Sequence, residues 1–207
     1  MKYLFILDYA RLDQGAFLKH FARSLAGLKL ESFMMIHADS AYTTRITETG
    51  VLTETARIRA VKELNHRLTA LFADEGIPLI AINGYQRDTI VQSGQELTLN
   101  SSYLLDLGSK TNVLISNLIA DGEGKTIQLP LAKLAKALHA QLHFEHIIAF
   151  DANDKPESLI MTGETDEAAE NVLPDELKDH QLPLLLIRPS QMASGKAFQK
   201  AINTGKP

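Results

Sequence analysis

The sequence contains no cysteine among its 207 residues. This absence excludes disulfides, thiol catalysis and thiolate metal sites. No segment reaches the roughly 20 consecutive apolar residues that a membrane-spanning helix needs, so we expect no membrane span. Basic residues are in deficit, with 21 Lys and Arg against 25 Asp and Glu and a formal net charge of -4. This deficit argues against a nucleic-acid backbone as a partner.

The beginning of the chain lacks the features of a secretory signal. Its apolar run, YLFIL at 3–7, is short and is followed by Asp8 and Arg11. A signal peptide needs a longer apolar core that no charge interrupts. The run therefore predicts a buried first strand, and we expect a cytoplasmic protein.

Two catalytic motifs are absent as well. The segment DGEGKT (121–126) resembles the end of a Walker phosphate loop, but Ile119 stands where that loop needs its first glycine. Pro130 also makes the following helix begin too late for the GKT residues to lie in its first turn. The segment NSSY (100–103) has no Gly-x-Ser-x-Gly frame. The sequence thus contains neither a Walker loop nor a hydrolase nucleophile motif.

Short apolar runs alternate with segments of helical periodicity along most of the chain. Such alternation predicts a mostly parallel β-sheet with helices on both faces. Alternation around Ser93–Gly94 predicts a hairpin within 88–100, and the polar residues 152–182 predict a loop with weak helical turns. The predicted strands are 3–7, 32–37, 77–82, 112–120, 146–150 and 182–187, and the predicted helices lie around 17–28, 54–75, 101–107, 131–142 and 194–203.

Three parts of the sequence match one known family in their order of apolar and polar positions. The first, RITETGVLTETARIRAVKELNHRLTALFADEGIPLIAINGY (45–85), is similar to an Arg-x-Thr segment, a long helix and a buried strand of that family. The second, NVLISNLIADGEGKTIQLPLAKLAKALHAQLHFEHIIAFDAND (112–154), is similar to the elements that close its substrate site. The third consists of YLFILDYARLD and MMIHADSAY, at the positions of two glycine-rich loops. On these segments the chain resembles N-acetylglutamate kinase and the wider amino acid kinase family.

The resemblance implies a fold and a domain organisation. The fold is a three-layer α/β/α sandwich with a mostly parallel sheet. Residues 1–150 correspond to the N-terminal substrate and dimerisation domain, and residues 151–207 to a truncated remnant of the nucleotide-binding half, packed on the same domain. The resemblance also implies a homodimer, an active paralogue as a possible partner and a link to arginine biosynthesis.

The positions that carry chemistry in the family are changed in this sequence. The resemblance implies a lysine and paired glycines after the first strand, three glycines after a histidine at the second, and Asn-x-Asn-Ala-Asp where the helix near 130 begins. Phosphoryl transfer depends on positive charge and backbone amides held at the phosphates, so their loss predicts a catalytically degenerate protein. The changed positions are Ile6, Asp8 and Tyr9, then Ala38, Asp39 and Ser40, and finally Pro130 and Ala132.

Other positions keep the residue type of the family. Arg45 matches the arginine that binds the substrate carboxylate, Asn65 matches a helix asparagine, and His37 matches the histidine of the second loop. A guanidinium fork suits bidentate binding of a carboxylate. These three residues are therefore candidates for binding an acidic molecule such as N-acetylglutamate. The alternative roles are a salt bridge for Arg45 and structural hydrogen bonds for His37 and Asn65. Lys196 and Lys200 are candidates for the second catalytic lysine of the family.

Three functions remain open from the sequence. The first is a degenerate relative that binds a small acidic ligand or regulates a partner, without cofactor or metal. The second is an active amino acid kinase that uses ATP and Mg²⁺ to phosphorylate a carboxylate substrate. The third is a Mg²⁺-dependent α/β enzyme that uses Asp8, Asp39 and Asp151, which all follow predicted strands.

A further metal pattern lies near the end of the helix at 131–142. His139, His143 and His146 are separated by four and three residues, which a metal site can use. Solvated histidines at the helix end are the simpler interpretation, and we expect no metal there.

Overall fold

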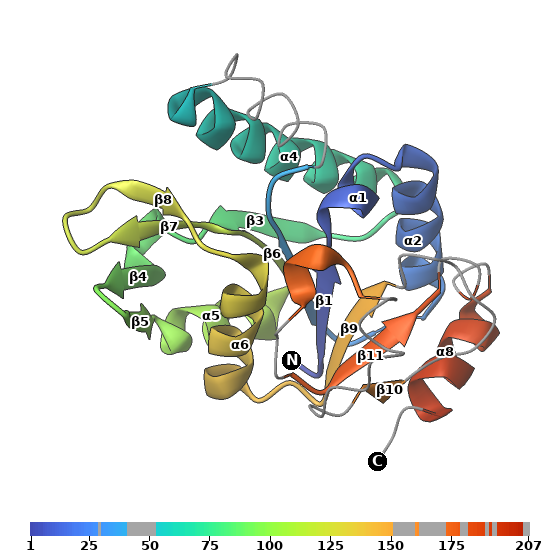
Figure 1. Ribbon diagram of the computed structural model, residues 1–207. Helices are drawn as coiled ribbons and strands as arrows, with labels where there is room; N and C mark the ends of the chain where they lie inside the picture. The colour runs from blue at the N-terminus through green and yellow to red at the C-terminus, as the bar shows by residue number, and fades with distance from the viewer. Residues whose placement is uncertain are drawn as a thin grey trace.

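A seven-stranded sheet forms the centre of the molecule (Figure 1). The computed structural model describes residues 1–28, 30–40, 53–150, 160–161, 173–178, 182–188, 191 and 194–204. The strand order is β10-β11-β9-β1-β2-β6-β3, and only the pair β10 and β11 is antiparallel. The predicted, mostly parallel sheet is thus confirmed. The strands are β1 (Tyr3–Leu7), β2 (Phe33–His37), β3 (Leu79–Asn83), β6 (Asn112–Ser116), β9 (His146–Phe150), β10 (Ile160–Met161) and β11 (Leu184–Ile187).

Helices cover both faces of this sheet. Successive side chains of a strand point to opposite faces, so the continuous apolar run of β1 supplies two cores. Phe5 and Leu7 pack with α2, α4 and α8, whereas Leu4 and Ile6 pack with α5 and α6. This arrangement confirms the predicted α/β/α sandwich. The helices are α1 (Tyr9–Leu12), α2 (Gly15–Leu28), α4 (Glu54–Asp74), α5 (Ser101–Lys110), α6 (Leu131–Leu142) and α8 (Gly195–Thr204).

The ends of the helices follow from local sequence. Thr53 begins α4 by accepting a hydrogen bond from the N–H of Ala56, and Gly76, with φ of 78°, follows its end. Glycine adopts this left-handed conformation without the steric cost of a side chain. Pro130 directly precedes α6, where its fixed φ suits the start of a helix. None of the helices in the described residues is long and apolar enough to cross a membrane.

A second, four-stranded sheet is absent from the sequence prediction. Its order is β5-β4-β7-β8, and the hairpin of β4 and β5 confirms the prediction for 88–100. Gly84 lets this sheet approach β3, because a Cβ at Gly84 would lie 2.8 Å from the carbonyl oxygen of Leu118. The strands are β4 (Ile90–Ser93), β5 (Glu96–Leu99), β7 (Leu118–Asp121) and β8 (Thr126–Gln128).

The chain passes from one sheet to the other at Asn117. The prediction of a single strand at 112–120 is therefore wrong, since β6 belongs to the main sheet and β7 to the second. The N–H of Asn117 donates to the carbonyl oxygen of His37 (2.9 Å), and its own carbonyl accepts from the N–H of Leu129 (2.9 Å). The apolar run continues through both strands, so periodicity alone does not reveal the change of sheet.

The shortest elements are also missing from the sequence prediction. These are α1, the strand β10 and the 3₁₀ helix η1 (Gln86–Asp88). Each has four residues or fewer, which is too short for a hydrophobic pattern to repeat. Strand β10 falls in the segment 152–182, which is predicted as a loop with weak helical turns, and the 3₁₀ helix η2 (Asp175–Leu177) is one such turn.

Candidate functional site

The parallel strands bring polar side chains together at one edge of the main sheet. Ligands of open α/β sheets bind at the edge formed by the carboxyl ends of the strands. We therefore take this edge as the candidate site. Its polar residues at or just after the ends of β1, β2, β3 and β6 are Asp8, His37, Asp39, Asn83 and Ser116, and α4 adds Arg57 and Asn65.

Four of these residues form one hydrogen-bonded chain, which we call the His37 network. His37 Nε2 lies 2.7 Å from Asn65 Oδ1, and Asn65 Nδ2 donates to Asn83 Oδ1 (3.0 Å) and to the carbonyl oxygen of Ile82 (3.3 Å). Ser116 Oγ donates to the same Asn83 oxygen (2.8 Å). The network thus joins the ends of β2, β3 and β6 to α4, and it holds three neighbouring strands in fixed register.

His37 is occupied on both sides of its ring. Its Nδ1 lies 2.8 Å from the carbonyl oxygen of Ala38, and its Nε2 faces Asn65. Burial lowers the pKa of His37, while the contacts with Asn65 and Ala38 and the charge of Asp39 oppose that effect. A neutral imidazole has one N–H and donates to only one of the two oxygens at a time. Both ring nitrogens of His37 therefore face groups of the chain, and its single N–H orients either Asn65 or the end of β2.

Asp39 is neutralised by a cation from α4. The Asp39 side chain is 1% exposed, and its Oδ2 lies 2.9 Å from Arg57 Nε. Its Oδ1 accepts a hydrogen bond from the N–H of Ser40 (2.9 Å). A carboxylate in the interior needs such partners, because burial of an unpaired charge costs several kcal/mol. Both oxygens of Asp39 are thus engaged within the chain.

Two carboxyl groups meet where β1 ends. Asp8 caps α1 through a hydrogen bond from the N–H of Arg11 to Asp8 Oδ1 (3.0 Å), and Arg11 Nε lies 3.9 Å from Asp8 Oδ2. Glu176 Oε1 accepts a hydrogen bond from the N–H of Tyr9 (2.6 Å). Figure 1 shows η2, which carries Glu176, over the end of β1 and beside α1.

The second carboxylate changes the ionisation of the first. Burial raises the pKa of Asp8 to about 6, Arg11 opposes the increase, and Glu176 adds to it. Burial and Glu176 also raise the pKa of Tyr9. At the end of β1 the ionised form of Asp8 is therefore disfavoured, first by burial and then by the charge of Glu176.

The residues singled out in the sequence are distributed over several parts of the molecule. His37 and Asn65 lie in direct contact, while Lys196 and Lys200 are exposed on α8. Helix α8 packs on α2 and β11, and neither lysine belongs to the His37 network. The binding and catalytic roles of these residues stay predictions. Arg45 and Asp151 lie outside the described residues.

The changed family positions are mostly buried. Ile6 and Ala38 are core residues at the ends of β1 and β2, and Ser40 is also buried. Pro130 precedes α6, and Ala132 in its first turn packs against the core. The start of α6 therefore presents apolar groups.

A metal site finds no support among the described residues. They contain no group of three or more His, Asp or Glu side chains that could hold an ion. His139 and His143 lie at the end of α6, whereas His146 lies in β9 and stacks on Tyr3 with the ring centres 5.2 Å apart. The spacing of these histidines in the sequence does not bring all three to one point.

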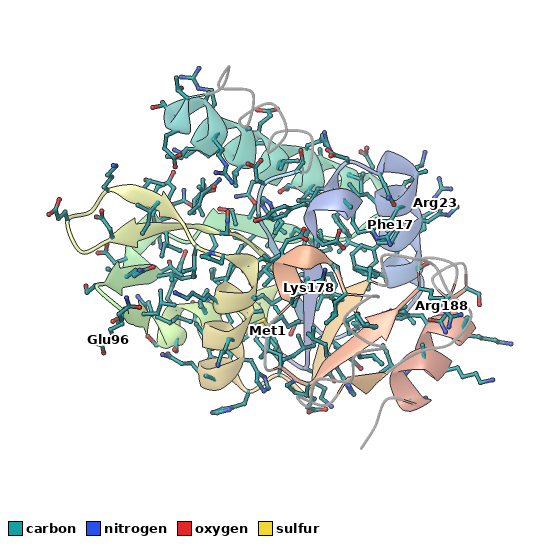
Figure 2. All side chains as sticks on the ribbon, viewed as in Figure 1. Met1, Phe17, Arg23, Glu96, Lys178 and Arg188 are labelled. Atoms are coloured by element: carbon teal, nitrogen blue, oxygen red, sulfur yellow. The ribbon has the colours of Figure 1, made fainter. Side chains whose placement is uncertain are left out.

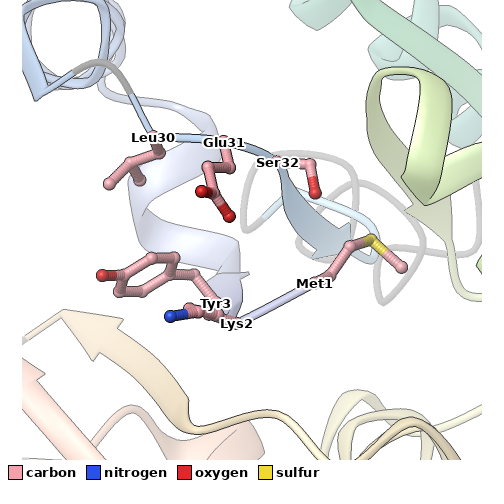
Figure 3. Close-up of a pocket in the computed structure, with 6 residues that line it drawn as sticks. All are labelled: Met1, Lys2, Tyr3, Leu30, Glu31 and Ser32. Atoms are coloured by element: carbon pink, nitrogen blue, oxygen red, sulfur yellow. The ribbon is translucent and has the colours of Figure 1, made fainter.

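Two hollows of the surface lie away from the carboxyl ends of the strands. One, of about 320 Å³, is at the opposite edge of the sheet, where Lys2, Tyr3, Glu31 and Ser32 line it (Figure 3). The other, of about 550 Å³, lies between α2 and α4. Neither contains a residue of the His37 network or of the Asp8 and Glu176 pair.

Several residues of the site are missing from the sequence interpretation. Asn83 and Ser116 each end a strand, so their position at the carboxyl edge was the available signal. Arg57 stands eight residues before Asn65 on the same helix, which is also readable from the sequence. Glu176 carries no such signal, because its partner Tyr9 is 167 residues away.

We expect the replacement Asn65→Leu to destabilise the protein by about 2 kcal/mol, because His37 and Asn83 lose a buried hydrogen-bond partner. The free energy of unfolding can be measured by urea denaturation. Asn203→Leu is the matched control at an exposed position of α8, and it should change stability by no more than about 0.5 kcal/mol. Equal stability of the two variants would show that the His37 network does not contribute to the free energy of unfolding.

Neither a protein-family model nor a curated protein sequence matches the chain. Solved structures match its fold. Isopentenyl phosphate kinase aligns with a TM-score of 0.65 and 14% identity over 100% of this chain and 98% of that chain. N-acetylglutamate synthase from Neisseria gonorrhoeae aligns with a TM-score of 0.61 and 14% identity, over 87% of this chain and 51% of the synthase.

An aspartate kinase extends the comparison. The enzyme from Synechocystis aligns with a TM-score of 0.57 and 12% identity over 92% of this chain and 38% of its own length. The chain thus spans about half of the synthase and less than half of this kinase. Identities of this size establish architecture, and activity has to be argued from the site. The chain has the fold of the amino acid kinase family, as its sequence resemblance implies.

Proposed function

We propose that this protein is a catalytically degenerate relative of N-acetylglutamate kinase that binds a small acidic molecule and acts as a regulatory protein. The observation that carries the proposal is the contact of Glu176 Oε1 with the N–H of Tyr9, next to the buried Asp8. By the family resemblance, this position belongs to a glycine-rich loop that faces phosphates. Here the carboxylate of Glu176 accepts the hydrogen bond from the backbone N–H of Tyr9.

The charges at the candidate site support this proposal. Phosphoryl transfer is catalysed mainly by positioning and by positive charge at the phosphoryl oxygens. At the ends of β1 and β2, Arg11 and Arg57 each lie next to a carboxylate of the chain, Asp8 and Asp39. These cations are already used to compensate buried acid groups. A nucleotide would have to replace Asp8 and Asp39 as the partners of these arginines. Its phosphates would also be repelled by the carboxylate of Glu176.

A small acidic ligand fits the remaining features better. By the family resemblance, Arg45 would bind the ligand carboxylate. The synthase from Neisseria gonorrhoeae, which shares the fold, has been solved with coenzyme A and N-acetyl-glutamate. We propose N-acetylglutamate or a similar acylated amino acid as the ligand. The protein would act in the cytoplasm, either as a homodimer or by binding and regulating an active paralogue.

An active kinase is the second candidate. The match to isopentenyl phosphate kinase covers 98% of that chain, so a kinase of similar size and fold exists. In that function Lys196 or Lys200 would serve the phosphates of MgATP. The two hypotheses differ in a simple observable, which is the binding of MgATP.

Thermal unfolding with separate ligands tests the proposal. N-acetylglutamate at about 100 times its dissociation constant should stabilise the protein by about 2.7 kcal/mol. Arg45→Ala should abolish this effect, and Arg59→Ala, at an exposed position of α4, should retain it. MgATP should give no stabilisation. Transfer of the γ-phosphate of ATP to N-acetylglutamate would refute the degenerate function, and the absence of any effect of N-acetylglutamate would refute the ligand.

A further inference from the structure

Arg188 is a buried cation at the other end of the carboxyl edge. It directly follows β11, which pairs with β9 and lies two strands away from β1. The residue is 5% exposed. One strand, β9, therefore lies between the strands that end at Arg188 and Asp8, and the His37 network lies farther along the sheet.

The guanidinium of Arg188 presents a buried fork of donors. Its Nε and Nη2 atoms have no hydrogen-bond partner within the part of the chain that the structure describes. One N–H bond of each nitrogen lies in the guanidinium plane, and the two run parallel along the same edge. This is the arrangement that binds two oxygens of a carboxylate or phosphoryl group at once.

The backbone holds Arg188 next to the start of a helix. Its N–H donates to Gln191 Oε1 and its carbonyl accepts from the N–H of Gln191, both at 3.0 Å. Ser194 then caps α8 by accepting a hydrogen bond from the N–H of Ala197 (3.1 Å). Figure 2 shows Arg188 where β11 ends, beside the amino-terminal end of α8.

The electrostatic surroundings also favour an anion. The amino-terminal end of a helix carries partial positive charge, and α8 spans ten residues. Its first turn contains Lys196 and no acidic residue. An arginine keeps its charge in proteins, and a charge that is buried without compensation strongly disfavours the folded state. A bound anion would remove that cost.

We propose that Arg188 is the centre of a binding site for a small-molecule oxyanion, a carboxylate or a phosphoryl group, between the end of β11 and the start of α8. The fork of Nε and Nη2 binds two oxygens of the anion, and the helix end adds its partial charge. This site does not depend on the function proposed above, because it involves neither Arg45 nor the His37 network.

The test compares anions at constant ionic strength. The melting temperature of the wild-type protein is measured in millimolar inorganic phosphate, in acetate and in chloride. We expect phosphate or acetate to raise it relative to chloride, and the more effective of the two identifies a phosphoryl or a carboxylate ligand. Isothermal titration with the same anion then gives the affinity.

Two variants of Arg188 and one control complete the experiment. Arg188→Met should abolish the response and, without the anion, should be at least as stable as the wild type, because an uncompensated buried charge is removed. Arg188→Lys keeps the charge without the fork, and its affinity should fall about tenfold or more. Arg23→Met, on the exposed side of α2 (Figure 2), should respond like the wild type.

Two outcomes would overturn the site. One is a wild-type protein that responds to neither anion. The other is a response that Arg188→Met retains, which would mean that the anions act elsewhere or by general exclusion from the surface. Binding of N-acetylglutamate is measured separately, so either proposal can fail without the other.

Discussion

Replacement of Arg57 by methionine is expected to lower the free energy of unfolding by about 3 to 5 kcal/mol at pH 7.5. Arg57 Nε lies 2.9 Å from Asp39 Oδ2, and the Asp39 side chain is 1% exposed. Among the described residues, the variant leaves this buried carboxylate with the hydrogen bond from the N–H of Ser40. Because the cation is removed and the charge remains, the full cost of burying the carboxylate falls on the folded state. Urea denaturation followed by circular dichroism at pH 7.5 measures the loss of stability.

Two further variants control for the loss of side-chain packing. Arg59→Met makes the same replacement at an exposed position of the same helix, and it should change stability by no more than about 0.5 kcal/mol. Asp39→Asn combined with Arg57→Met removes both charges and should recover most of the loss. A double variant as unstable as Arg57→Met would show that the arginine acts through its aliphatic contacts.

The fold was predictable from the sequence wherever an element is long and its apolar residues follow a single helix or strand period. The helix predicted at 54–75 is α4 (Glu54–Asp74), and the run YLFIL is β1 (Tyr3–Leu7). Prediction failed where two elements share one apolar pattern. The run at 112–120 serves β6 and β7, and only the hydrogen bonds of Asn117 show that the chain changes sheets there.

The site was predictable only in part, for a related reason. The resemblance placed His37 and Asn65 in one site, and in the structure His37 Nε2 lies 2.7 Å from Asn65 Oδ1. It did not provide the partners that decide what the site can bind. Glu176 reaches Tyr9 across 167 residues of sequence, from a 3₁₀ helix of three residues. A side chain contributed by so short an element leaves no pattern in the sequence, although its charge changes the chemistry of the edge.

Replacement of Asp8 by asparagine is expected to stabilise the protein at neutral pH. Burial is the main cause that raises the pKa of Asp8 from its ordinary value of 3.8 to about 6, and Glu176 adds to it. Between these two values the folded state holds a proton that the unfolded state has already lost. The contribution of Asp8 to stability therefore falls as the pH rises from 3.8 through 6. Above that range the ionised group costs the folded state about 3 kcal/mol.

Asparagine removes the charge and keeps the cap of α1, since its side-chain oxygen can accept the hydrogen bond from the N–H of Arg11. Asp8→Asn should therefore match the wild type near pH 3.5 and exceed it by up to about 3 kcal/mol at pH 7.5. Urea denaturation at several pH values gives the two curves. For Asp74→Asn, at an exposed position of α4, the curve of unfolding free energy against pH should have the same shape as that of the wild type.

The opposing effect at this position is the attraction of Arg11, whose Nε lies 3.9 Å from Asp8 Oδ2. If Asp8→Asn proves less stable than the wild type at pH 7.5, this attraction outweighs the burial of the charge. The end of β1 would then tolerate negative charge, and the argument that Asp8 and Glu176 together repel a phosphate would lose its basis. A gain in stability at neutral pH would instead show that the chain maintains an unfavourable acid at the place where, by the family resemblance, phosphates would be held.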